Sequence, residues 1–101
     1  MTFTRITTEA ALPPIDEAAE FICGGRAICI ANVNGTYSAM DGICPHRGGP
    51  LGQGMIEGCK VVCPWHAWAW DAQTGATELD SKLKVQIYPM KIENGDVIAE
   101  I

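Results

Sequence analysis

Short runs rich in apolar and β-branched residues recur along the chain, with turn residues between them; residues 2–7 alternate between apolar and polar positions. The runs cover residues 2–7, 18–23, 26–31, 36–40, 60–62, 67–70, 85–92 and 96–101. The pairs Gly24-Gly25, Asn34-Gly35 and Asn94-Gly95 separate neighbouring runs, and such pairs supply the positive φ angles that tight hairpin turns need. Many short strands with turn signals between them are typical of an all-β sandwich or barrel.

Helical patterns are confined to two very short segments. Residues 9–12 and residues 16–19 are each long enough for one helical turn, and a single turn does not stand as an independent helix. We therefore expect an all-β protein, a sandwich or a barrel. A length of 101 residues fits one domain spanning residues 1–101.

The charge balance excludes two classes of partner. The net charge is −5, from 7 lysine and arginine residues against 12 acidic residues, and no basic run occurs. Nucleic acids and anionic membrane surfaces attract basic patches, so neither is expected to bind. No apolar stretch approaches the ~20 residues of a membrane span, and the first residues do not resemble a secretory signal. We expect a cytoplasmic protein that does not enter a membrane.

Two segments each carry one cysteine and one histidine. Cys44-Pro45-His46 comes first, and Cys63-Pro64-Trp65-His66 follows after a gap of sixteen residues. The chain contains no other histidine. Because both segments lie between predicted strands, each can form a loop at the tip of a sheet.

The mixed composition of these segments indicates which metal they bind. Thiolates suit zinc and iron–sulfur clusters, and imidazoles suit zinc and iron. The common zinc finger has a cysteine pair and a histidine pair in separate segments, whereas each segment here supplies one of each. This mixture suits a Rieske-type 2Fe–2S cluster, in which two histidines replace two of four cysteines. Structural zinc remains the competing interpretation.

The residues that follow the two segments match a known signature. Arg47-Gly48 follows the first, and Trp68-Ala69-Trp70-Asp71 and Thr74-Gly75 follow the second. Over residues 41–75 the chain resembles the soluble Rieske ferredoxins and Rieske domains of bacterial ring-hydroxylating oxygenase systems. The resemblance implies a Rieske (ISP-like) fold of three stacked antiparallel sheets, with a small cluster-binding subdomain at about residues 42–70.

The same resemblance implies a cofactor and a function. One 2Fe–2S cluster per chain would have Cys44 and Cys63 on one iron and His46 and His66 on the other. The chain would be a monomeric one-electron carrier between an NAD(P)H-dependent flavoprotein reductase and a terminal oxygenase. It would be an electron-transfer protein and not an enzyme, because the sequence shows no flavin- or nicotinamide-binding glycine motif.

Two alternatives stay open from the sequence. The small subunit of assimilatory nitrite reductase shares this fold, and the chain would then be a fixed subunit and not a mobile carrier. A zinc-stabilised binding module would have no redox role.

Three substitutions relative to respiratory Rieske proteins predict a low reduction potential. Those proteins carry an additional disulfide-bonded cysteine in each loop and a serine that donates to the cluster; Gly49, Trp65 and Trp68 occupy these positions here. Fewer donors to sulfur stabilise the reduced state less. The family also often has a proline-bearing third loop over the cluster, but residues 79–84 contain no proline, so we assign no functional residue there.

The remaining cysteines and tryptophans have structural interpretations. Cys23 and Cys29 lie in apolar strand-like runs and are expected to be buried free thiols, while Cys59 is an incidental turn residue. Alternation places Trp68 and Trp70 on one face, where they are expected to fill the core. Trp65 stands between ligands and is expected to border the cluster or a docking face.

Overall fold

Three antiparallel sheets build the protein. The computed structural model describes residues 3–65 and 67–101. The strands and 3-10 turns are β1 (Thr4–Thr8), η1 (Glu9–Ala11), β2 (Glu17–Cys23), β3 (Arg26–Val33), β4 (Thr36–Asp41), η2 (Leu51–Gln53), β5 (Met55–Glu57), β6 (Lys60–Val62), β7 (Ala69–Asp71), β8 (Ile87–Tyr88), β9 (Met90–Glu93) and β10 (Asp96–Ala99). Residue 2 of the first predicted strand lies outside the described residues.

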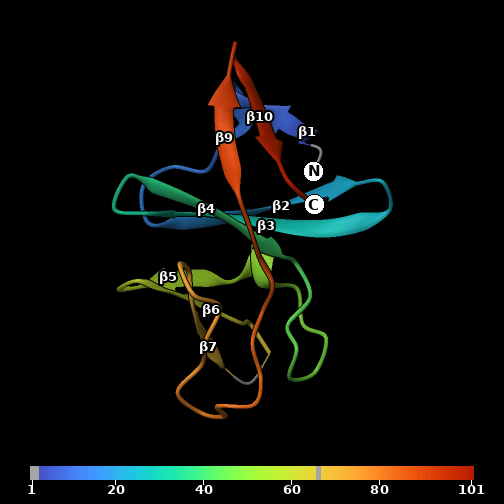
Figure 1. Ribbon diagram of the computed structural model, residues 1–101. Helices are drawn as coiled ribbons and strands as arrows, with labels where there is room; N and C mark the ends of the chain where they lie inside the picture. The colour runs from blue at the N-terminus through green and yellow to red at the C-terminus, as the bar shows by residue number, and fades with distance from the viewer. Residues whose placement is uncertain (1–2, 66) are drawn as a thin grey trace.

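The sheets are stacked with the longest strands in the middle. Their strand orders are β1-β10-β9, β2-β3-β4-β8 and β5-β6-β7. Figure 1 shows the β2-β3-β4 layer crossing the centre, with the β1-β10-β9 sheet on one side and the β5-β6-β7 sheet on the other. The predicted all-β class with stacked antiparallel sheets is confirmed.

The predicted hairpin turns are present and follow the expected backbone conformation. Asn34 and Gly35 connect β3 to β4 with φ values of 53° and 92°, and Val33 pairs with Thr36 across the turn. Two successive positive φ angles define the type I′ turn, which matches the twist of the flanking strands. The β2–β3 and β9–β10 connections likewise have two positive φ angles each.

The central strand β3 is buried on both faces. Ile28 and Ile30 pack in a cluster with Val97 and Ala99 of β10. Cys29 and Ala31, which point the opposite way, pack in a second cluster with residues of the β5-β6-β7 sheet. This double burial explains why β3 is a continuous apolar run and not an alternating one.

Two segments differ from their sequence patterns. Residues 16–19 are long enough for one helical turn, but β2 begins at Glu17, where pairing of Ala18 with Ala31 of β3 outweighs the helical tendency of alanine. Residues 85–92 were expected to form one strand. They form β8 in the central sheet and β9 in another sheet, with Pro89 between them, since proline has no N–H for a ladder.

No helix in residues 3–65 and 67–101 has the length and hydropathy to cross a membrane.

Candidate metal centre

The first ligand segment lies on a loop whose base is fastened to the central sheet. The loop leaves β4 and returns at η2. The N–H of Gly42 donates to the carbonyl of Ala27 at 2.8 Å, and the N–H of Leu51 donates to the carbonyl of Gly42 at 2.9 Å. Both ends of the loop are therefore held at one point beside β3.

The loop closes on itself around Cys44. The N–H of Cys44 donates to the carbonyl of Gly49, and the N–H of Gly48 donates to the carbonyl of Cys44, each at 2.8 Å. Residues 44–49 thus form a hydrogen-bonded turn that carries both Cys44 and His46. Pro45, between these two residues, has no backbone N–H and so needs no hydrogen-bond acceptor in this turn.

The second ligand segment extends the β6–β7 hairpin. Val62 pairs with Ala69, and the N–H of Cys63 donates to the carbonyl of Trp68 at 2.8 Å, so the ladder continues one residue beyond the strands. The N–H of Trp65 donates to the Sγ atom of Cys63 at 3.4 Å. Cys63 is thereby held at the tip of a rigid hairpin.

The two loops bring Cys44 and Cys63 together in the interior. Their exposed fractions are 2% and 1%, and they share one buried cluster. Burial raises the pKa of the Cys63 thiol; the hydrogen bond from Trp65 opposes this shift, and the hydrogen bond and charge interaction with Cys44 add to it. With its pKa raised, the buried Cys63 thiol is a poor thiolate by itself, and a bound metal cation would favour its deprotonation.

Gly49 leaves room beside the Cys63 sulfur. A Cβ atom at residue 49 would lie 2.6 Å from Cys63 Sγ and 3.2 Å from the Cβ of Trp65. Gly49 is itself buried. A side chain here would occupy the space next to the paired thiols, so glycine is the residue that permits this close approach.

His46 lies against an aromatic ring. Its imidazole stacks on Trp68 with the ring centroids 3.9 Å apart and the planes at 11°, and its Nδ1 atom is buried. The centroids of Trp68 and Trp70 are 6.0 Å apart. His66, the fourth predicted ligand, lies outside the described residues.

The structure brings part of the predicted ligand set together. Cys44 and Cys63 are neighbours, as predicted. Within residues 3–65 and 67–101, no three His, Cys, Asp or Glu side chains gather closely enough to hold a metal ion, so His46 is not grouped with the two thiols. The placement of the complete four-residue set remains a prediction.

One apolar residue of the third loop, to which the sequence gave no role, packs on the core near the site. Leu83 packs against the buried cluster that contains Cys44 and Cys63. Its turn is stabilised by Asp80, whose carbonyl accepts the N–H of Leu83 at 3.1 Å and whose Oδ1 accepts the N–H of Lys82 at 2.9 Å. Leu83 stands between Lys82 and Lys84, a pattern that does not by itself indicate burial.

The Asp71 carboxylate stabilises the turn after β7. Its Oδ1 accepts the N–H groups of Gln73 at 2.8 Å and Thr74 at 3.0 Å. Burial would raise the pKa of Asp71, but these hydrogen bonds and one from the Cys59 thiol outweigh it and lower that pKa. Asp71 and Thr74 of the signature therefore stabilise this turn, and the Cys59 thiol donates a hydrogen bond of 3.7 Å to the Asp71 carboxylate.

The other two cysteines differ from each other. Cys29 is fully buried, as predicted, and burial, aided by the charge of Glu20, raises the pKa of its thiol to about 12. Cys23 is only half-buried, which corrects the prediction of full burial, and its thiol donates to the carbonyl of Arg5. It stands at the end of β2, next to the exposed Gly24-Gly25 turn. All five cysteines are free.

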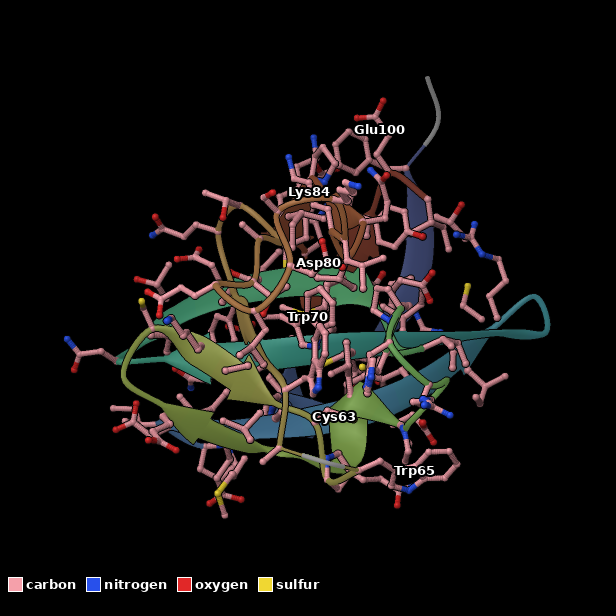
Figure 2. All side chains as sticks on the ribbon, turned by 90° about the horizontal axis from the view of Figure 1, so that it is seen from below. Cys63, Trp65, Trp70, Asp80, Lys84 and Glu100 are labelled. Carbon is pink, nitrogen blue, oxygen red and sulfur yellow. The ribbon has the colours of Figure 1, made fainter. Side chains whose placement is uncertain are left out.

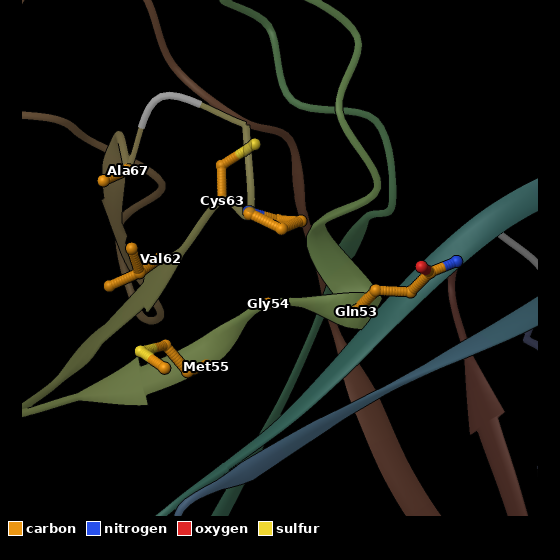
Figure 3. A pocket seen from close by; sticks show the side chains of 7 residues that line it. Gln53, Gly54, Met55, Val62, Cys63 and Ala67 are labelled. Atoms are coloured by element: carbon orange, nitrogen blue, oxygen red, sulfur yellow. The ribbon is translucent and has the colours of Figure 1, made fainter.

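An apolar pocket of about 370 Å³ adjoins Cys63 (Figure 3). Its lining residues are Gln53, Gly54, Met55, Val62, Cys63, Pro64 and Ala67. Met55 and Trp65 are largely exposed, at 63% and 50%, and Figure 2 shows Trp65 projecting from the surface. The surface beside the second loop is therefore apolar, in agreement with the position expected for Trp65.

These features fit a 2Fe–2S group. Two buried thiols meet from separate loops, a backbone N–H is directed at one sulfur, and residue 49 leaves the adjacent space free. The Rieske [2Fe-2S] domain family model matches residues 3–89. The chain belongs to this family, and the predicted Rieske-type 2Fe–2S cofactor is thereby confirmed.

Two curated relatives of similar size are named ferredoxin components. One, from the p-cumate 2,3-dioxygenase system of Pseudomonas putida, is 32% identical over 76% of this chain and 67% of its own length. The other, from the naphthalene 1,2-dioxygenase/salicylate 5-hydroxylase systems of a Ralstonia species, is 34% identical over 76% of this chain and 75% of its own length.

Larger proteins contain the same domain. The chain is 38% identical to oxygenase components of 3-ketosteroid-9-alpha-monooxygenase from Rhodococcus rhodochrous and Mycobacterium tuberculosis. It spans only 15% and 12% of their lengths. The similarity to these oxygenases is therefore limited to one part of each.

Solved structures share the fold over the full chain. The Sphingomonas yanoikuyae B1 ferredoxin has a TM-score of 0.86 at 25% identity, with 99% of each chain covered. A putative nitrite reductase small subunit from Mycobacterium tuberculosis has a TM-score of 0.83 at 17% identity, covering 99% of this chain and 96% of its own. The second match establishes a common fold alone.

Proposed function

We propose that this chain is a one-electron carrier whose cluster is held by Cys44 and Cys63 on one iron and by His46 and His66 on the other. Residues of about 42–70 would form the cluster-binding part of a single domain spanning residues 1–101. The observation that carries the proposal is the meeting of two buried thiols from separate loops in a chain of the Rieske family. When bound, the cluster supplies reversible uptake of one electron.

The ligands set the charge at the site. Neutral imidazoles of His46 and His66 replace two negatively charged thiolates, so the cluster and its ligands carry less negative charge than in an all-cysteine site. Adding an electron therefore costs less free energy. This is the physical reason why Rieske centres lie at about −150 to +300 mV and plant-type centres near about −400 mV. Within the described residues, the N–H of Trp65 is the donor to a predicted ligand sulfur.

The midpoint potential is expected near the negative end of the Rieske range. Gly49, Trp65 and Trp68 add no side-chain hydroxyl or disulfide next to the predicted ligands. A redox titration followed by EPR measures the potential directly. A midpoint above about +100 mV would contradict the expectation.

Replacing a histidine ligand tests the charge argument. His46→Cys adds a thiolate in place of a neutral ring, and any cluster that still assembles is expected to have a lower midpoint than the wild type. His46→Ala, assayed in parallel, reports whether residue 46 is needed for assembly. An unchanged midpoint in a cluster-bearing His46→Cys variant would refute the role of charge.

The proposed partners are a flavoprotein reductase that oxidises NAD(P)H and a terminal oxygenase. Two relatives of similar length are ferredoxin components of dioxygenase systems, which supports a carrier and not a catalyst. The apolar pocket beside Cys63 and the exposed ring of Trp65 each supply apolar surface for docking close to the site. We propose a soluble monomer in the cytoplasm, where the three cysteines outside the proposed ligand set, Cys23, Cys29 and Cys59, remain reduced.

Three measurements separate this function from its alternatives. The purified protein is expected to contain about two iron and two sulfide per chain; stoichiometric zinc without sulfide would establish the binding-module alternative. A carrier elutes alone in size-exclusion chromatography. Constant co-purification with a large siroheme-containing subunit would instead favour a nitrite reductase subunit, whose fold this chain shares.

A further inference from the structure

The indole N–H of Trp70 is buried without a hydrogen-bond acceptor. Trp70 has an exposed fraction of 0%. Its Nε1 atom is inaccessible to solvent and has no partner among residues 3–65 and 67–101. Native proteins satisfy nearly all buried polar groups, and an exception often points to an ion or group that completes the site. Core packing, the role expected of Trp70 from its sequence position, does not explain the buried N–H.

The strand register places Trp70 on the same face as Cys63. Trp70 pairs with Val61 across the β6–β7 hairpin. The hydrogen bond from the N–H of Cys63 to the carbonyl of Trp68 continues this ladder, so that Cys63 lies opposite Trp68. Side chains alternate between faces, so Val61, Cys63, Trp68 and Trp70 share one. Diagonal cross-strand neighbours lie within reach of an aromatic side chain.

The surroundings of Trp70 offer few acceptors other than sulfur. It belongs to one buried cluster with both predicted cysteine ligands, and the other members are Cys29, Ala31, Met40, Leu51, Val61, Ala72 and Val85. Figure 2 shows Trp70 and Cys63 together at the centre of the molecule. The aliphatic members have no side-chain acceptor, so the acceptors among the cluster's side chains are the sulfur atoms of Cys29, Met40, Cys44 and Cys63. Of these, Cys44 and Cys63 are the predicted ligands, and Cys63 shares the face of Trp70.

We propose that the indole N–H of Trp70 donates to a sulfur of the metal centre, either a cysteine ligand or a bridging sulfide. The inference rests on the cluster proposed above. A donor to sulfur stabilises the negative charge that reduction adds, so Trp70 raises the midpoint potential. The indole and the Trp65 amide then act on the site from two sides of the second loop.

Paired tryptophan variants test this role. Trp70→Phe keeps an aromatic ring but removes the donor, and its midpoint is expected to be more negative than that of the wild type. Trp68→Phe is the matched control, since it removes an indole N–H from a half-buried ring two residues away. A Trp70→Phe midpoint equal to that of the wild type, or shifted no further than in Trp68→Phe, would overturn the proposal.

A spectroscopic readout on the wild type keeps the test independent of variant folding. Protein labelled with ¹⁵N-indole tryptophan is reduced in D₂O, and pulsed EPR measures nuclei coupled to the unpaired electron. We expect coupling to an exchangeable deuteron and an indole ¹⁵N that persists in Trp68→Phe and disappears in Trp70→Phe. A cluster EPR signal without indole coupling refutes the Trp70 donor alone, whereas absence of a cluster signal refutes the proposed function.

Discussion

Cys63→Ser is expected to abolish cluster binding and to lower the melting temperature of the purified protein. Serine offers a hard oxygen in place of the soft thiolate that iron–sulfur clusters require. Cys63 and Cys44 also meet in the buried interior from different loops. Loss of the shared metal therefore removes the link between the two loops, and metal-binding energy is folding energy in such sites.

Iron, sulfide and visible absorbance measure this loss, and thermal unfolding measures its effect on stability. Cys59→Ser is the matched control because Cys59 is exposed and the described hydrogen bond of its side chain is with Asp71, a bond that serine can also make. The control is expected to retain the full cluster content. A Cys63→Ser protein that holds iron and sulfide at the wild-type level would remove Cys63 from the ligand set.

Gly49→Ala is expected to reduce cluster content several-fold. The added Cβ would lie 2.6 Å from Cys63 Sγ and within 3.2 Å of two Trp65 atoms, so the thiol or the loop must move. Overpacking of a close-packed interior typically costs about 1–3 kcal/mol. Here that displacement falls on a predicted ligand, so loss of iron is expected to exceed the loss of stability.

The adjacent glycine gives a control for the variant itself. A Cβ at residue 48 meets no atom within 4 Å, although the φ of Gly48 is +78°. Gly48→Ala therefore introduces backbone strain of about 1–2 kcal/mol without entering the site. If the two variants lose iron to the same extent, crowding at Cys63 is not the cause.

The features that the sequence predicted are those set by neighbouring residues. Asn34-Gly35 determines its turn through the backbone conformation of two residues, and the ligand segments are recognisable from fixed spacing. The turns follow local rules, and the observed hairpins obey them. The meeting of Cys44 with Cys63 was instead implied by the resemblance to Rieske proteins, whose ligand pattern the two segments match.

The features that escaped prediction depend on residues far apart in the chain. The tendency of residues 16–19 to form a helical turn gave way to pairing with β3. Leu83 carries no local signal that it packs against the buried cluster of Cys44 and Cys63, and the stacking of His46 on Trp68 joins two loops that only the fold brings together. Periodicity also cannot show where Pro89 transfers the chain from one sheet to another.

The double burial of β3 has a mechanical consequence. Alternate residues of this one strand belong to different cores: Ile28 and Ile30 pack in one, and Cys29 and Ala31 pack in the other. Neither core can unfold completely while β3 keeps its native position, and both cores are lost when β3 unfolds. The distal β1-β10-β9 sheet is thereby coupled to the metal-binding end through the backbone of β3.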